Sequence, residues 1–129
     1  MDPADRKYTK EHEWLKLESN GEAEMGLTQY AQEQLGDIVY LTLPSPGDRV
    51  EQNKSLGEVE SVKAVSDISA PASGEVIAVN EELDEHPELL NQDPYGKGWI
   101  ARLRLSAPEE LDQLLSSQEY EALLAAQEG

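Results

Sequence analysis

Lys63 is the residue best suited to covalent chemistry, since it is the only basic residue between Lys54 and Lys97. Short apolar runs flank it over residues 56–62 and 65–79. We interpret these flanks as two strands that place Lys63 near a hairpin tip. A free amine on a rigid tip suits a group that an enzyme must find and acylate. A solvated turn lysine is the alternative, because a Lys-Ala turn lacks the Gly or Asn that a type I′ hairpin prefers. The local sequence leaves both interpretations open.

Other side chains offer little reactive chemistry. The chain contains no cysteine, which excludes a disulfide framework, a thiolate nucleophile and a cysteine-based metal site. His12 and His86 are far apart in the sequence, which argues against a zinc or iron site. Any redox chemistry must therefore come from an imported group.

The charge balance limits the classes of partner. The 129 residues carry a formal net charge of −17. Nucleic acid and anionic membrane surfaces are disfavoured, because phosphate neutralisation needs a basic face. An acidic chain is instead steered toward basic docking surfaces, or is simply kept soluble at high concentration.

Targeting signals are not evident. The sequence has neither a secretory apolar region nor an apolar run near eighteen residues, and residues 1–5 are acidic, unlike a transit peptide. We expect a cytoplasmic protein of bacterial type with no targeting segment.

The elements that must position Lys63 are mostly strands. Asn20-Gly21 is a strong turn dipeptide, and Thr28 and Gly36 have the types expected at the start and stop of a short helix. Asn80, followed by two acids, can open another short helix. Besides the two flanks of Lys63, we expect strands at residues 14–17, 23–27, 38–43 (largely buried) and 99–105 (half-exposed).

The C-terminal segment, residues 106–129, is predicted to be helical and packed on a single domain that spans residues 1–129. Ser106 with Glu109, and Ser116 with Glu119, have capping-box spacing, which predicts two short helices with a break near Ser116. Apolar residues make a stripe that we expect to pack on the sheet; they are Leu111, Leu114, Leu115, Tyr120, Leu123 and Leu124.

Four blocks of sequence carry a family resemblance. Residues 58–64, together with Ser66-Asp67 and residues 71–76, resemble the lipoyl-attachment signature of the H-protein family of the glycine cleavage system. Three further blocks match the same family in order and at its spacing: residues 8–14, 26–47 and 91–99. The resemblance covers nearly the whole chain.

The resemblance implies a fold and a function. The fold is a barrel-sandwich hybrid of two small antiparallel sheets with short peripheral helices, and the cofactor is lipoate, bound as an amide to Lys63. The arm accepts an aminomethyl group from glycine decarboxylase (P protein) and presents it to the aminomethyltransferase (T protein) for transfer to tetrahydrofolate. Dihydrolipoamide dehydrogenase (L protein) then reoxidises it. The chain is thus expected to be a monomeric carrier, not an enzyme, and to need a lipoate-attaching enzyme.

Acidic residues near Lys63 are candidates for protecting the loaded arm. An aminomethyl thioether is fragile in water and its amine is protonated near neutral pH, so a cleft with acids would shelter it. Asp67 follows Lys63 by four residues on the returning strand. The family motif places the Glu13 position beside the cleft that receives the arm. Glu11 stands where relatives can have a small hydroxyl residue, so we assign it no role.

Glu60 and His12 are two further residues whose position in the sequence suggests a role. Glu60 precedes Lys63 by three residues and is a candidate for recognition by the lipoylating enzyme, or else a solubilising strand residue. His12 is interpreted as a structural histidine packed near Trp14.

Other functions remain open from the sequence. A biotinyl carrier would carry methionines beside its lysine, which Lys63 lacks, and the lipoyl domain of a 2-oxoacid dehydrogenase would lack the N-terminal and C-terminal blocks. An H-like lipoyl donor for lipoylation of other proteins fits the same residues. An interaction module would retain full binding after Lys63→Arg.

Overall fold

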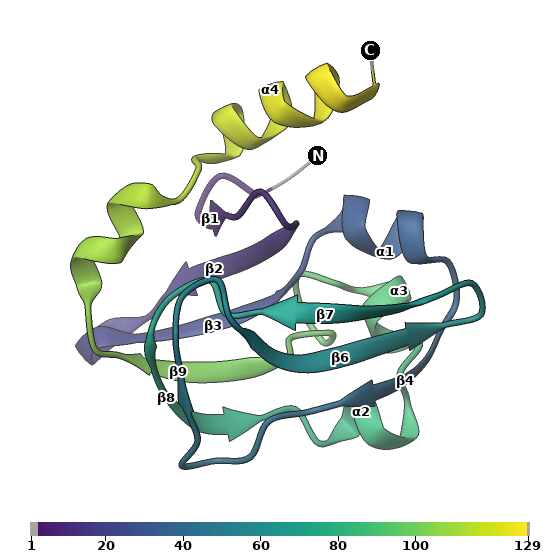
Figure 1. The fold of residues 1–129 in the computed structure, drawn as a ribbon, viewed down its shortest axis with the longest axis horizontal. Coiled ribbons are helices and arrows are strands. Elements are labelled where there is room, and N and C mark those ends of the chain that lie inside the picture. The colour runs from purple at the N-terminus through teal and green to yellow at the C-terminus, as the bar shows by residue number, and fades with distance from the viewer. Residues whose placement is uncertain (1–2, 129) are drawn as a thin grey trace.

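The computed structural model describes residues 3–128. Met1, Asp2 and Gly129, the ends of the expected domain and part of the acidic start, lie outside the described residues. Two sheets dominate the structure (Figure 1), one of six strands in the order β1-β2-β3-β9-β8-β5 and one of three in the order β4-β6-β7. All of their strand pairs are antiparallel. The mainly β fold with two antiparallel sheets is confirmed, although the described strands form no closed barrel.

The elements follow one another in short steps along the chain. Their bounds are β1 Lys7–Tyr8, β2 Glu13–Leu17, η1 Ser19–Gly21, β3 Glu22–Leu27, α1 Gln29–Leu35, β4 Ile38–Thr42, β5 Arg49–Val50, β6 Ser55–Ser61, β7 Val65–Ser69, β8 Gly74–Val79, α2 Glu82–Glu85, α3 Leu89–Gln92, β9 Ala101–Leu105, η2 Pro108–Gln113 and α4 Ser117–Glu128. No helix within residues 3–128 has both the length and the apolar character needed to cross a bilayer.

Strands β6 and β7 form the hairpin expected around Lys63. Glu60 pairs with Val65 at the tip and Ser55 with Ser69 at the base. The second flank, residues 65–79, is not one side of this hairpin, however. It divides into β7 and into β8, which pairs with β5 and β9 in the other sheet. Pro71 lies at the division, where its missing N–H interrupts a continuous ladder.

Strand β4 is less buried than its apolar sequence predicts. Ile38 and Leu41 are 4% and 2% exposed, whereas Val39 and Tyr40 are 48% and 57% exposed. The strand lies at the edge of the three-stranded sheet, and its pairing with β6 is irregular between Ile38 and Tyr40. The irregular pairing breaks the alternation of side chains and leaves two consecutive residues, Val39 and Tyr40, exposed, so the prediction of a largely buried strand is wrong.

Local turn and cap predictions are confirmed. Strands β2 and β3 form a hairpin across Asn20 and Gly21, whose φ angles of 61° and 75° are the left-handed values that these residue types tolerate. The Thr28 hydroxyl accepts a hydrogen bond from the Ala31 N–H at the start of α1. Gly36 ends that helix.

The core fills the space between the two sheets. Buried apolar side chains come from the six-stranded sheet, as Met25, Val76 and Leu103 do, and from the small sheet, as Val59 and Ile68 do. Burial of these side chains fixes the β6–β7 hairpin on the rest of the molecule.

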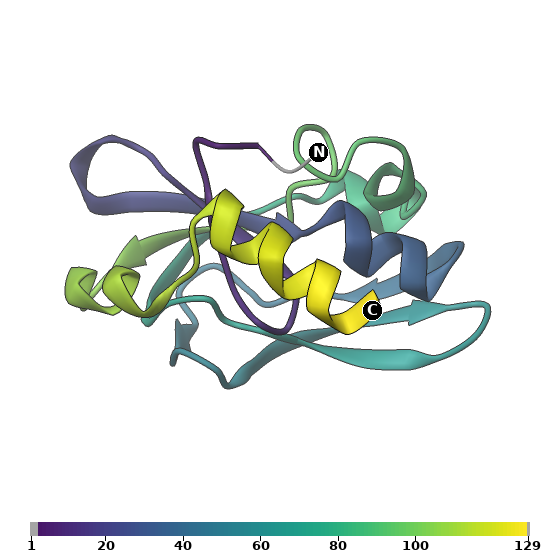
Figure 2. The ribbon, with the colours of Figure 1, turned by 90° about the horizontal axis from the view of Figure 1, so that it is seen from above.

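The C-terminal segment forms two helices, η2 and α4, with the break at the predicted place. Tyr120 of α4 is fully buried against Tyr8 and Trp14. The backbones of Tyr8 and Leu115 exchange two hydrogen bonds of 2.8 Å. Figure 2 shows α4 lying across the N-terminal strands, so residues from the two ends of the described chain share one cluster.

Candidate functional site

Ser61 builds the turn that carries Lys63. Its hydroxyl oxygen accepts hydrogen bonds from the backbone N–H groups of Lys63 and Ala64, each at 3.1 Å. The backbone N–H of Ser61 donates to the carbonyl of Ala64 at 2.8 Å. Val62 and Lys63, the central residues of this turn, have no positive φ, so the turn needs neither Gly nor Asn, and the Ser61 side chain stabilises it instead. This serine is the signal in the sequence that an inspection of the Lys-Ala pair alone misses.

The tip is fastened to the end of α1. Val62 N–H donates to the carbonyl of Asp37 at 3.1 Å. A Cβ built on Gly36 would lie 3.3 Å from Cε of Lys63, so the lysine stem runs close to this helix end. Lys63 is exposed, and no ion pair is formed with it in the part of the chain that the structure describes. Its amine is therefore open to an acylating enzyme.

A cleft of about 170 Å³ lies between the start of β2, helix α1 and the hairpin. Leu27, Leu35 and Val59 supply apolar wall, while Glu11, Glu13 and Asp67 bring three carboxyl groups. Leu35 immediately precedes Gly36, beside which the Lys63 stem runs. The cleft therefore begins close to the outer part of the Lys63 side chain, from Cδ to Nζ.

Glu13 is a buried acid in this cleft. Its side chain is 2% exposed. One carboxyl oxygen accepts a hydrogen bond from the Thr9 hydroxyl at 2.5 Å, and the other accepts from Ser69 N–H at 3.3 Å. Burial raises the pKa of Glu13 to about 7, against the lowering effect of these two hydrogen bonds. The group is thus close to half-ionised near neutral pH, and a cation in the cleft would favour its charged form.

Asp67 lines the same cleft from β7 but is exposed. Ser55 donates to it at 3.5 Å, and Glu58 lies opposite it on β6. The structure thus brings Glu13 and Asp67 to one cavity from strands of different sheets. Glu60 does not line the cleft. It is exposed on β6, where it pairs with Val65 beside the Lys63 turn.

His12 also lines the cleft, which gives it a different setting from the one expected. Its ring packs on Tyr30 at 4.6 Å and on Tyr120 at 5.7 Å between centroids. Trp14, the expected neighbour, contacts the Tyr95 ring and belongs to the same buried cluster as Tyr120. Sequence reasoning missed Tyr120 because it lies 108 positions away, and a local pattern carries no signal for such a pair.

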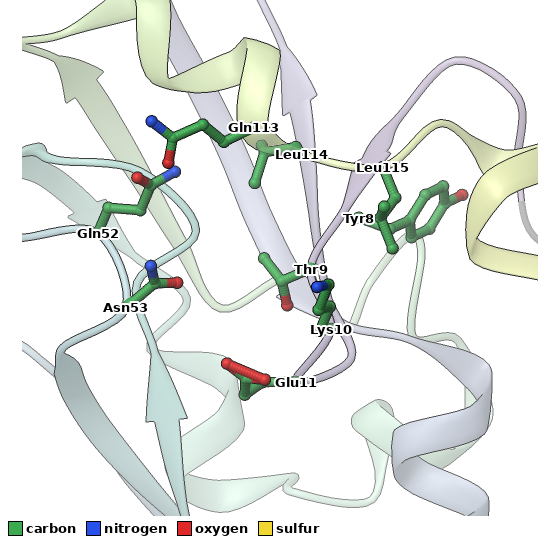
Figure 3. Close-up of a pocket in the computed structure, with 9 residues that line it drawn as sticks. All are labelled: Tyr8, Thr9, Lys10, Glu11, Gln52, Asn53, Gln113, Leu114 and Leu115. Atoms are coloured by element: carbon green, nitrogen blue, oxygen red, sulfur yellow. The ribbon is translucent and has the colours of Figure 1, made fainter. Parts of the chain in front are cut away.

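A second cavity, of about 240 Å³, adjoins the first through Glu11. Figure 3 shows Thr9, Lys10 and Glu11 on one side of it, with Gln52 and Asn53 on another. Thr9 therefore lines this second cavity while its hydroxyl donates to Glu13 of the first.

The dimensions fit an acyl arm on Lys63. Four lysine methylenes, an amide and a chain of the length of a lipoyl group reach about 12–14 Å. At about 3.3 Å per strand residue, Asp67 lies at most about 13 Å along the hairpin from Lys63. An arm of that length can reach Asp67 and enter the cleft, whose apolar walls suit its hydrocarbon part.

Comparison with known proteins gives consistent matches over nearly the whole chain. The family described as glycine cleavage H-protein matches residues 6–127. The glycine cleavage system H protein of Symbiobacterium thermophilum is 55% identical over 120 residues, covering 93% of each chain. That of Carboxydothermus hydrogenoformans is 52% identical over 95% of this chain and 93% of its own length. A crystal structure of a glycine cleavage system H protein from Mycobacterium marinum matches with a TM-score of 0.89 at 39% identity, covering 96% of this chain and 99% of that one.

Proposed function

The chain belongs to the glycine cleavage H-protein family, and from this premise we propose that Lys63 bears lipoate as an amide. Family membership makes the chain a carrier of the glycine cleavage system, in glycine catabolism and one-carbon metabolism. The group on Lys63 accepts the aminomethyl unit from glycine decarboxylase, presents it to the aminomethyltransferase for transfer to tetrahydrofolate, and is reoxidised by dihydrolipoamide dehydrogenase. The carrier is their shared substrate.

The observation that carries this proposal is the position of Lys63. Its amine stands on a turn that Ser61 fixes, is exposed, and has its stem beside the start of the acidic cleft. A lysine with a merely solubilising role needs none of these features. The bound group supplies the dithiolane chemistry, and the protein supplies its reach and shelter.

Glu13 and Asp67 protect the loaded arm in the cleft. Ionised carboxyl groups hold a protonated amine, and the apolar walls exclude the water that would hydrolyse the thioether. Glu13 is the group that adapts, because its pKa of about 7 falls when a cation arrives beside it. Asp67 supplies a second carboxyl group at the exposed side of the cleft.

The partners dock around the hairpin tip. Val62, Val65 and Tyr40 are between 57% and 67% exposed beside Lys63, and Glu60 stands among them. This combination fits partner surfaces with an apolar centre and basic rim, and Glu60 is the candidate that the lipoate-attaching enzyme reads. The chain then works as one monomeric domain of residues 1–129 in the cytoplasm.

Intact mass is the first test. Protein from lipoate-supplemented cells should show a lipoyl increment that peptide fragmentation maps to Lys63. The increment should vanish in Lys63→Arg. It should persist in Lys54→Arg, the matched control, because Lys54 lies just before β6 at the base of the same hairpin. An unmodified Lys63 in cells that lipoylate other proteins would defeat the proposal and favour an interaction module.

A further inference from the structure

A buried hydrogen-bonded chain joins the C-terminal helix to the cleft. The Tyr120 hydroxyl lies 2.8 Å from Nδ1 of His12 and 2.7 Å from the hydroxyl oxygen of Thr28. Tyr120 and Thr28 are both fully buried. His12 lines the cleft, and Thr28 caps the helix α1 that forms its wall. Tyr120 itself does not line the cleft, but His12, which it contacts, does.

The direction of this chain can be worked out from Thr28. Its oxygen accepts a hydrogen bond from Ala31 N–H at 3.2 Å, and the hydroxyl also has one proton to donate. Within residues 3–128, the Tyr120 oxygen is the acceptor that the structure gives this proton. Thr28 therefore donates to Tyr120. The reverse direction would leave a buried hydroxyl proton without an acceptor, which is unfavourable.

With Thr28 as donor, Tyr120 can in turn donate its own proton to Nδ1 of His12, 2.8 Å away. In that arrangement Nδ1 accepts and carries no proton, so the His12 ring is neutral with its proton on Nε2. Burial lowers the pKa of His12 below its ordinary value, which agrees with a neutral ring. The described residues supply no hydrogen-bond partner to Nε2. His12, which lines the cleft, thus has Nδ1 engaged by Tyr120 and Nε2 left to donate.

We propose that Tyr120 is a positioning residue that holds His12 as its Nε2–H form, and that this N–H donates to the sulfur of the arm in the cleft. The inference rests on the proposed function. The amine of the loaded arm is protonated near neutral pH and so has no lone pair, which leaves sulfur as the acceptor at that end. A neutral imidazole also adds no positive charge beside that amine, whereas an imidazolium would repel it.

The tautomer is measured first, on the unloaded protein, by nitrogen chemical shifts of the His12 ring. The wild type should show one species protonated at Nε2. In Tyr120→Phe the ring still stacks on Tyr8, at 4.8 Å between centroids, but the donor is gone, so His12 should become a mixture of tautomers. A wild-type proton on Nδ1, or an unchanged ring in Tyr120→Phe, would overturn the assignment. This measurement needs no lipoate and stands apart from the proposed function.

The contact with the arm is tested by two substitutions of His12. The side-chain amide of Asn ends near the position of the His12 Nδ1 atom, so it retains a hydrogen-bond partner for Tyr120 but does not reach the Nε2 position. Asn also tolerates the φ of 73° at residue 12. Gln reaches the Nε2 position with an N–H. Loaded with glycine and glycine decarboxylase, His12→Asn and Tyr120→Phe should release formaldehyde and ammonia about 3- to 10-fold faster than wild type, the range expected for one lost hydrogen bond. His12→Gln should stay within about twofold of wild type.

The outcomes separate the two proposals. If loaded His12→Asn releases formaldehyde and ammonia at the wild-type rate although the tautomer is confirmed, the proposed contact of His12 with the arm is wrong and the proposed carrier function is unaffected. Equal acceleration in His12→Gln and His12→Asn would also sink it, because loss of ring packing would then explain both. Absence of a lipoyl increment on Lys63 would defeat the proposed function itself, whatever the His12 ring shows.

Discussion

Glu58 and Asp67 lie directly opposite each other on β6 and β7, two carboxyl groups in one antiparallel pair. Only Asp67 lines the cleft. Like charges at such a pair destabilise a sheet, so Asp67→Asn should raise the free energy of unfolding by roughly 0.2–0.5 kcal/mol, the small value reflecting their exposure to solvent. The same change should hasten loss of the aminomethyl group from the loaded carrier. Urea unfolding and formaldehyde release measure the two effects.

Glu58→Gln is the matched control, because it removes the same repulsion from the other side of the pair. It should reproduce the gain in stability without changing the lifetime of the loaded arm. If both variants shorten the lifetime of the loaded arm equally, the net charge of the hairpin explains the effect, and Asp67 has no specific role in protecting the arm.

The buried carboxyl of Glu13 makes stability depend on pH. Its pKa of about 7 in the folded chain exceeds the ordinary value of 4.5, so the folded chain binds this proton more tightly than the unfolded chain does. Below about pH 4.5 both states are protonated and nothing is lost. As the pH rises toward 7, the unfolded chain ionises first and the folded chain loses roughly 2–4 kcal/mol of relative stability. Above about pH 7 the loss is complete.

Comparison with Glu13→Gln isolates this contribution. Gln cannot ionise, and the fixed cost of placing its amide beside Ser69 N–H cancels when two pH values are compared. The wild type should therefore lose more stability than the variant between pH 4.5 and 8, by the amount given above, in urea unfolding. Parallel pH profiles for the two proteins would show that Glu13 titrates as an ordinary acid.

Ser61 should matter for lipoylation as well as for folding. Ser61→Ala removes the oxygen that accepts from Lys63 N–H and Ala64 N–H, and so costs about 1–3 kcal/mol if those groups stay unpaired. The turn loosens, and the lipoate-attaching enzyme should modify Lys63 several-fold more slowly at saturating lipoate. Ser61→Thr retains the hydroxyl and should be modified at a rate near wild type. Equal rates in all three proteins would mean that the enzyme imposes the turn itself.

Local features of the fold could be predicted from the sequence where one short segment decides them. The Asn20-Gly21 turn, the Thr28 cap and the tip position of Lys63 are of this kind. Exposure of Tyr40 was not predictable, because it depends on the irregular pairing of β4 with β6, which is a tertiary property. The continuation of the hairpin into residues 74–79 was wrong for a similar reason, since pairing of β8 with β9 is a choice among distant partners.

The candidate site divides in the same way. The sequence indicated Lys63 and, from its place four residues further on, Asp67, while the family motif indicated Glu13; the structure brings Glu13 and Asp67 to one cleft. Neither source indicated that Glu13 is buried and Asp67 exposed, because the difference comes from Thr9 and the contact of β2 with the small sheet. Burial of a carboxyl group is a tertiary property, and it decides which of the two acids has a shifted pKa.

Gly36 should be required at the root of the arm for two separable reasons. Its φ of 78° and ψ of −153° belong to a region that residues with a Cβ rarely adopt, so Gly36→Ala should cost about 1–3 kcal/mol of stability. The added Cβ would also lie 3.3 Å from Cε of Lys63 and push the stem away from α1. Lipoylation of Lys63 should therefore slow beyond what lost stability explains.

Gly21→Ala separates strain from contact. Gly21 also has a positive φ, of 75°, but a Cβ there would meet no atom within 4 Å, and the residue lies in the β2–β3 turn away from Lys63. This variant should lose stability in urea unfolding while Lys63 is modified at the wild-type rate. Both variants are assayed under conditions in which they are fully folded. The contact of Gly36 with the Lys63 stem matters for lipoylation only if Gly36→Ala is then modified more slowly than Gly21→Ala. Equal rates would reduce the role of Gly36 to ending α1.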